Sequence, residues 1–203
     1  MKKRFLLWLM QTRLYTYLLL HVIPYVRFTT YYTSLRGWKY LRGYRLLKPG
    51  DIILTLDRKK LTTLLIPGEF SHAALCVGKD CDFEVAEMTH TNYTMSTFFD
   101  ICKESDRVAV IRCRDWDPAY TQKVIEKCKS FKDAKYDVGF YLDIRALYCS
   151  ELVFQSDFQY RLQCNLTDLE GLGRPYISPT GLWNAYAKGR NADLVWDSDK
   201  ELK

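Results

Sequence analysis

Cys149 is the cysteine of this 203-residue chain that is best placed to act as a nucleophile. The sequence predicts that a loop passes into a helix at this point, with polar Ser150 and Glu151 next and apolar residues at helical spacing beyond. The positive end of a helix dipole lowers the pKa of a thiol and favours the thiolate. The free backbone N–H groups of a first helical turn can also hold a developing oxyanion.

The other six cysteines do not suggest a second chemistry. Seven cysteines is an odd number, and no Cys-x-x-Cys pair is present, which argues against a zinc site or a thioredoxin-like motif. Cys128 falls on the apolar face of a predicted helix, so we interpret it as a core residue. The sequence also lacks a glycine-rich phosphate loop and clustered metal ligands. We therefore expect no metal and no cofactor.

Three histidines could serve as the base for a cysteine nucleophile. His21 lies in an apolar N-terminal run, and His90 follows a predicted strand at its polar end. His72 lies inside a predicted strand, next to Ser71. A lone histidine in a strand is more often structural than catalytic, so position alone does not assign His72 a role.

Four segments, in order along the chain, resemble the permuted papain-like cysteine amidases, the YaeF/YiiX branch of the NlpC-type superfamily. They read PGDII at 49–53, FSHAA at 70–74, VAEM at 85–88 and YCSELV at 148–153, with KYD at 135–137 as a further likeness. The histidine precedes the cysteine by 77 residues, as in the permuted branch and unlike ordinary papain-like enzymes. The resemblance covers about residues 48–185.

The resemblance implies Cys149 as nucleophile, His72 as general base and later general acid, and Glu87 as the carboxylate that orients the imidazole. Glu84 competes for the third role, but strand alternation puts positions 84 and 87 on opposite faces. We prefer Glu87 because an apolar-Glu-apolar run fits the family pattern. The alternative is that Glu87 is a solvated charge at a strand end.

Tyr148 and Ser150, on either side of the nucleophile, are predicted to line the site or to assist the oxyanion hole. The mechanism that the resemblance implies is attack by the Cys149 thiolate on a carbonyl, followed by hydrolysis of the thioester.

The predicted elements indicate an α+β fold, because strands cluster in the middle of the chain with helices around them. The resemblance narrows this to a circularly permuted papain-like fold, with a small antiparallel sheet or barrel packed on helices. We expect a helical extension over residues 1–47 and the hydrolase domain over 48–203. The predicted strands are 52–56, 71–77, 83–88, 108–112 and 193–196, and the predicted helices are 96–102, one beginning at Asp117-Pro118, one beginning at Cys149, and 180–188.

The extension is unusually basic and aromatic. Residues 1–50 hold ten Lys or Arg, no Asp or Glu, and 11 of the 30 aromatic residues, so they carry +10, whereas residues 51–203 carry −4. Such a segment suits an anionic membrane surface or a nucleic-acid backbone, or it is a solvated face. We favour a membrane over nucleic acid, and the oligomeric state stays open.

The N-terminus begins like a signal peptide, but Arg13 interrupts its apolar run and no small-residue cleavage site follows. The next uncharged run, Leu14 to Val26, has 13 residues, fewer than the ~20 that cross a bilayer as a helix. We expect a helix that lies in the membrane interface or packs on the domain. With reduced thiols, this predicts a cytoplasmic protein, peripheral at a membrane.

Three functions compete. The first is hydrolysis of an amide or peptide bond, with a cell-wall peptide as one such substrate. The second is lipid acyl hydrolysis or transfer, as in the lecithin:retinol acyltransferase relatives, although their Asn-Cys-Glu-His-Phe type of segment is replaced here by Tyr-Cys-Ser-Glu. The third is a non-catalytic protein that docks on membrane or nucleic acid.

Overall fold

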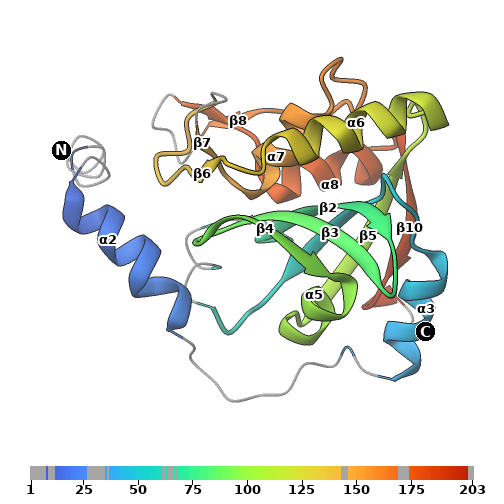
Figure 1. Ribbon diagram of the computed structural model, residues 1–203, viewed down its shortest axis with the longest axis horizontal. Helices are drawn as coiled ribbons and strands as arrows, with labels where there is room; N and C mark the ends of the chain where they lie inside the picture. The colour runs from blue at the N-terminus through green and yellow to red at the C-terminus, as the bar shows by residue number, and fades with distance from the viewer. Residues whose placement is uncertain are drawn as a thin grey trace.

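A six-stranded antiparallel sheet forms the centre of the molecule in the computed structural model, with strand order β10-β5-β1-β2-β3-β4 (Figure 1). The structure describes residues 8, 12–26, 35, 37–60, 63, 66, 68–142, 146–168 and 174–200. The strands of this sheet are β1 (Ile52–Leu56), β2 (His72–Lys79), β3 (Phe83–Thr89), β4 (Asn92–Thr97), β5 (Arg107–Cys113) and β10 (Ala192–Asp197).

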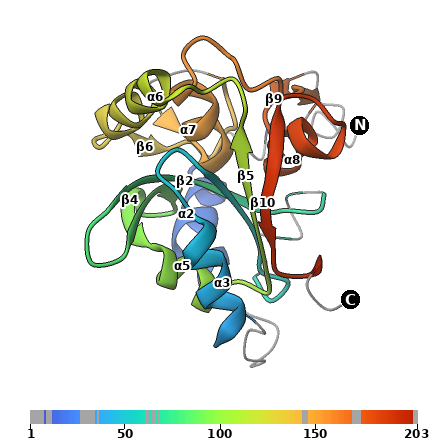
Figure 2. The ribbon, with the colours of Figure 1, turned by 90° about the vertical axis from the view of Figure 1, so that its right-hand side faces the viewer.

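Helices lie on both faces of the sheet, which gives three layers (Figures 1 and 2). The helices are α2 (Arg13–His21), the 3-10 turn η1 (Ile23–Tyr25), α3 (Trp38–Leu46), α5 (Phe98–Glu104), α6 (Pro118–Ser130), α7 (Cys149–Ser156) and α8 (Pro179–Ala187). Two short pairs complete the described elements: β6 (Lys135–Tyr136) with β7 (Ala146–Leu147), and β8 (Thr167–Asp168) with β9 (Pro175–Tyr176).

Strand alternation divides the apolar residues of the sheet into two cores. Ile52, Leu54 and Leu75 face α6, α7 and α8 and are fully buried there. Ile53 and Val110 point the other way, into a smaller core with α3 and α5. A sheet that is covered on both faces needs such nearly continuous apolar strands, which is why β1 could be recognised as buried from its sequence.

The predicted α+β class is confirmed, and most predicted elements are present within one or two residues of their expected ends. α6 begins as expected, with Asp117 at its N-cap accepting from the Tyr120 N–H and Pro118 in the first turn. Two elements differ. β2 continues through Lys79, past a bulge, where the sequence predicted a turn from Gly78 onward. β4 was not predicted at all, and the helix expected over 96–102 begins after it as α5.

β4 escaped the sequence analysis because its side chains are mostly polar. None of its residues is fully buried, because β4 lies at the edge of the sheet and, among the described strands, pairs only with β3. Hydrophobic alternation, the signal that identifies a half-buried strand, is correspondingly weak over residues 92–97.

Helix α3, near the end of the N-terminal extension, packs on the sheet. Gly43 of α3 lies beneath the ring of Trp196, close enough that a Cβ there would be 2.8 Å from two ring carbons. Tyr40 stacks on Phe98, with ring centroids 5.8 Å apart. α2 lies elsewhere, away from the layers that cover the sheet (Figure 1). Within the described ranges no helix combines the length and apolar character needed to cross a membrane.

Candidate active site

Cys149 occupies the first position of α7, where backbone N–H groups have no partner within the helix. The first helical hydrogen bond runs from the Leu152 N–H to the Tyr148 carbonyl at 3.0 Å. The N–H groups of Cys149, Ser150 and Glu151 therefore precede the helical hydrogen-bond pattern. The backbone N–H groups of Ser150 and of Ala73 on β2 lie near the sulfur of Cys149 and help to lower its pKa.

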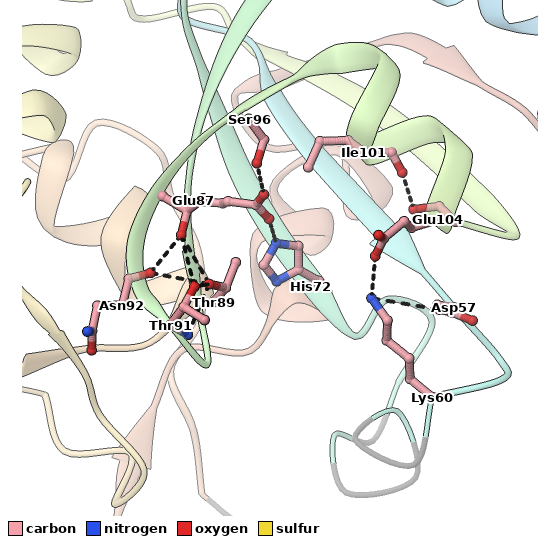
Figure 3. A network of polar contacts seen from close by, with 12 residues as sticks. Asp57, Lys60, His72, Glu87, Thr89, Thr91, Asn92, Ser96, Ile101 and Glu104 are labelled. Carbon is pink, nitrogen blue, oxygen red and sulfur yellow. Dashed lines mark hydrogen bonds and ion pairs between the residues drawn. The ribbon is translucent and has the colours of Figure 1, made fainter. Parts of the chain in front are cut away.

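His72, the first residue of β2, brings an imidazole to this sulfur. Its Nε2 lies 2.7 Å from Oε2 of Glu87 on the neighbouring strand (Figure 3). The ring also lies close enough to the Cys149 side chain for the two to shift each other's pKa, that of His72 upward and that of Cys149 downward. Because Nε2 is occupied by the carboxylate, Nδ1 is the nitrogen that faces the sulfur. The imidazole thus lies between a carboxylate and a thiol, the geometry that a nucleophile–base pair requires.

The electrostatics of these three side chains favour the charged pair of thiolate and imidazolium. Burial alone would raise the pKa of Cys149, but the hydrogen bond and charge of His72 hold it below its usual value. Burial alone would lower the pKa of His72, yet hydrogen bonds to Cys149 and Glu87 raise it to about 10. The pKa of Glu87 is lowered against its own desolvation, mainly by His72.

Five other cysteines, four of them buried and Cys164 half-buried, behave in the opposite way. Desolvation raises the pKa of Cys76, Cys113, Cys128 and Cys164 to about 12, and that of Cys102 is also raised. Cys128 is fully buried in the core, as expected from its helical spacing. Relative to a free thiol, ionisation is therefore favoured at Cys149 and disfavoured at these five positions.

Ser96 is a partner of Glu87 that the sequence analysis missed. Its hydroxyl donates to Oε1 of Glu87, so both carboxylate oxygens are engaged, one by Ser96 and one by His72 (Figure 3). Ser96 lies on β4, paired with Val85, diagonally across from Glu87. Because β4 itself was not recognised, no sequence signal placed this serine in the site.

Glu84 lies on the opposite face of β3, as strand alternation predicted. Its carboxylate is 3.7 Å from Nζ of Lys129 on α6 and its side chain is 45% exposed, whereas that of Glu87 is 10% exposed. Of the two candidate carboxylates, Glu87 is the one brought to His72.

The side chains of Tyr148 and Ser150 are both directed to the backbone of Ile177. The Ile177 N–H donates to the Tyr148 hydroxyl at 3.0 Å, and the Ser150 hydroxyl donates to the Ile177 carbonyl at 2.7 Å. These bonds fix the start of α7 against the segment that leads into α8. What reaches the Cys149 sulfur from position 150 is therefore the backbone N–H and not the side chain.

A cleft of about 500 Å³ opens beside the three side chains. One wall is rich in hydroxyl groups, with Thr89, Thr91 and Thr94 hydrogen-bonded to one another. Leu19 and Tyr25 of the N-terminal extension also line the cleft. His90, which the sequence left without a role, lines it too and bonds the Tyr25 hydroxyl through Nε2 at 3.0 Å.

The comparison with solved structures finds a similar fold. The crystal structure of the metalloprotein yiiX from Escherichia coli O157:H7 matches with a TM-score of 0.62 at 18% identity, covering 73% of this chain and 96% of that one. In the described part of the present chain, no group of three or more His, Cys, Asp or Glu residues is arranged to hold a metal ion. Among curated proteins, no significant match was found.

A family model described as permuted papain-like amidase enzymes of the YaeF/YiiX type matches residues 46–201. This span contains all three residues of the site and every strand of the central sheet. The resemblance inferred from four short segments is thereby confirmed over three quarters of the chain. The protein belongs to the YaeF/YiiX family of permuted papain-like amidases.

Proposed function

We propose that this protein is a cysteine hydrolase that cleaves an amide or peptide bond through Cys149, His72 and Glu87. The observation that carries the proposal is the position of the His72 ring, which is hydrogen-bonded to Glu87 and lines the same cleft as Cys149, whose pKa it lowers. Membership of an amidase family supports hydrolysis. The lowered pKa of the Cys149 thiol supports the cysteine as the attacking group.

In the first half-reaction, the Cys149 thiolate attacks the carbonyl carbon and forms a C–S bond, and the C=O electron pair moves onto oxygen. The N–H group of Cys149 donates to that oxyanion, and the Ser150 N–H is free to join it once the C–S bond has removed the negative charge from the sulfur. The oxyanion then collapses, the C–N bond breaks, and the imidazolium of His72 gives its proton to the leaving nitrogen. The products are an amine and a thioester on Cys149.

In the second half-reaction, water attacks the thioester while neutral His72 takes one of its protons. The C–S bond breaks, the carboxylic acid leaves, and the thiolate–imidazolium pair is restored. Glu87 holds the ring in place through Nε2 and stabilises its positive charge in both halves. Ser96 in turn holds Glu87.

The lining of the cleft is suited to a polar substrate. Hydroxyl groups of Thr89, Thr91, Thr94 and Ser96 line it near His72 and can pair with the amide groups of an extended peptide. A short peptide such as one from a cell wall is the substrate class that we propose first.

Thiol labelling followed by mass spectrometry tests the nucleophile. At pH 6, iodoacetamide should modify Cys149 while the exposed Cys81 stays largely unmodified and serves as an internal reference. Labelling of Cys149 should fall in His72→Gln. Preferential labelling of Cys76 or Cys128 would show that the site is assigned to the wrong cysteine.

Turnover tests the reaction class. Wild type should hydrolyse members of a peptide-amide panel, and Cys149→Ala should not, while the control Cys128→Ala stays active if it folds. Should wild type and Cys149→Ala be indistinguishable on every substrate, a binding protein that retained the fold is the better interpretation.

A second candidate, hydrolysis or transfer of a lipid acyl group by the same residues, is favoured by one observation. Leu19 and Tyr25, from the basic and aromatic extension, line the cleft beside the polar wall. Activity assays with phospholipids and acyl esters, in parallel with the peptide amides, distinguish the two candidate functions. Both functions require Cys149, so only the substrate that is consumed differs between them.

A further inference from the structure

The α2–η1 segment presents an apolar stripe to solvent. Leu14, Tyr17, Leu18 and Val22 are 62%, 58%, 38% and 39% exposed. Their spacing of three and four residues puts them on one face of the helix. Four neighbouring apolar side chains exposed together are uncommon on a protein that meets only water, and such stripes mark interaction sites.

The opposite side of the same segment faces the catalytic cleft. Leu19 is 8% exposed and lines the cleft, together with Tyr25 from the turn that follows. Tyr25 is tied to the cleft by its bond to His90 and by an edge-on ring contact with centroids 5.2 Å apart. The stripe and the cleft are therefore two sides of one short element.

The positive charge of the N-terminal segment indicates which kind of partner the stripe binds. The stripe lies within the fifty residues that hold ten Lys or Arg and no acid, and Arg13 is exposed at the start of α2. A second copy of the chain would bring an equally basic segment against this one, which like-charge repulsion opposes. Anionic lipid headgroups attract it, and leucine, valine and tyrosine side chains suit the headgroup–acyl boundary.

We propose that α2 docks on an anionic bilayer through Leu14, Tyr17, Leu18 and Val22, lying in the interface without crossing it. In the docked protein, the wall of the cleft that Leu19 and Tyr25 form would be the wall nearest the bilayer. This contact with the bilayer is independent of the bond that the protein cleaves.

Vesicle sedimentation with the full chain tests the proposal. Wild type should sediment with vesicles of phosphatidylcholine and phosphatidylglycerol, less at higher salt, and little with phosphatidylcholine alone. The double variant Leu14→Gln/Leu18→Gln should bind the anionic vesicles roughly tenfold less or weaker still. Glutamine keeps good helix propensity, so the change removes apolar surface and not the helix.

The matched control is Phe99→Gln on α5, which alters a side chain that is also exposed, at 54%, but lies outside the stripe. It should bind like wild type, and circular dichroism should show all three proteins equally folded. Wild type that stays in solution with anionic vesicles would overturn the proposal, as would a double variant that binds like wild type. A dimer that the double variant dissociates, without vesicle binding, would assign the stripe to a second copy instead.

Discussion

Glu87 and His72 form a diagonal pair across β2 and β3, with Oε2 of the carboxylate 2.7 Å from Nε2 of the ring. Glu87 lies directly opposite Ala74, and His72 is two residues before Ala74 on the same face. A slip of one residue between the strands would turn Glu87 to the other face. The apolar residues that alternate with the pair oppose such a slip, so the packing of the sheet maintains the geometry of the pair.

We expect hydrolysis and alkylation to differ in their pH dependence. Because the pKa of Cys149 is lowered, the thiolate persists below the ~8.5 of a free thiol, and both rates should fall only as pH drops through that lowered value. At alkaline pH, loss of the His72 proton near 10 should reduce hydrolysis but leave alkylation high, because the thiolate persists. Rate profiles with iodoacetamide and with substrate measure this. An alkylation midpoint near 8.5 would contradict the ion pair.

Glu87→Gln should reduce hydrolysis by roughly a hundredfold, because the ring loses the charge that orients it and supports its proton. The pKa of His72 should fall, so the alkaline limb of the hydrolysis profile moves to lower pH. Glu84→Gln, on the same strand but the opposite face, is the matched control and should change neither kcat nor the profile. Equal losses of hydrolysis in the two variants would mean that any substitution of a glutamate on β3 is harmful, and would contradict a specific role for Glu87.

Asp51→Asn should destabilise the fold without disabling Cys149. Asp51 accepts from Arg112 through both oxygens, at 2.6 and 2.7 Å, and from the Lys48 N–H at 2.7 Å. Burial nevertheless raises the pKa of Asp51, so desolvation offsets much of this pairing. We expect a loss of roughly 1–3 kcal/mol in the free energy of unfolding, measured with urea.

The control for Asp51 is Asp193→Asn, which alters a salt bridge to Arg114 whose two side chains are about half exposed or more. It should cost less than about 1 kcal/mol. Cys149 labelling should stay at the wild-type rate in both variants. A labelling defect in folded Asp51→Asn would show that this pair also supports the site.

Gly43→Ala should destabilise the protein, although alanine is the better helix former by about 1 kcal/mol. A Cβ at this position would meet the ring of Trp196 at 2.8 Å, and Trp196 is 3% exposed, so it cannot yield easily. Overpacking of this kind costs roughly 1–3 kcal/mol. Arg45→Ala, exposed on the same helix, should change little. A more stable Gly43→Ala would mean that α3 is not packed firmly on the sheet.

The main elements of the site could be predicted because their signals are local. Asp117-Pro118 starts a helix through its own capping chemistry, and the polar-to-apolar change after Cys149 marks another helix start. Strand alternation alone placed Glu84 and Glu87 on opposite faces of β3, whichever strands lie beside it. Each of these inferences uses backbone geometry within a few residues.

Other parts of the site could not be predicted because they depend on which strands lie together. Ser96 meets Glu87 only through the pairing of β3 with β4, and the Ala73 N–H reaches the Cys149 sulfur only because α7 packs against β2. The sequence of the extension also does not predict that α3 covers the sheet or that α2 lies beside the cleft. Such contacts depend on register and packing between distant segments.

By itself, the sequence determined the candidate residues: a cysteine at a helix start, a histidine before it in the chain, and a glutamate two residues before the polar end of its strand. Tertiary structure decided that they meet, that Ser96 joins them and that α2 lies beside the cleft. The physical reason is that a residue's own conformational preferences act over only a few positions. An active site instead depends on strand register and on the packing of apolar faces between distant segments, here separated by 77 residues.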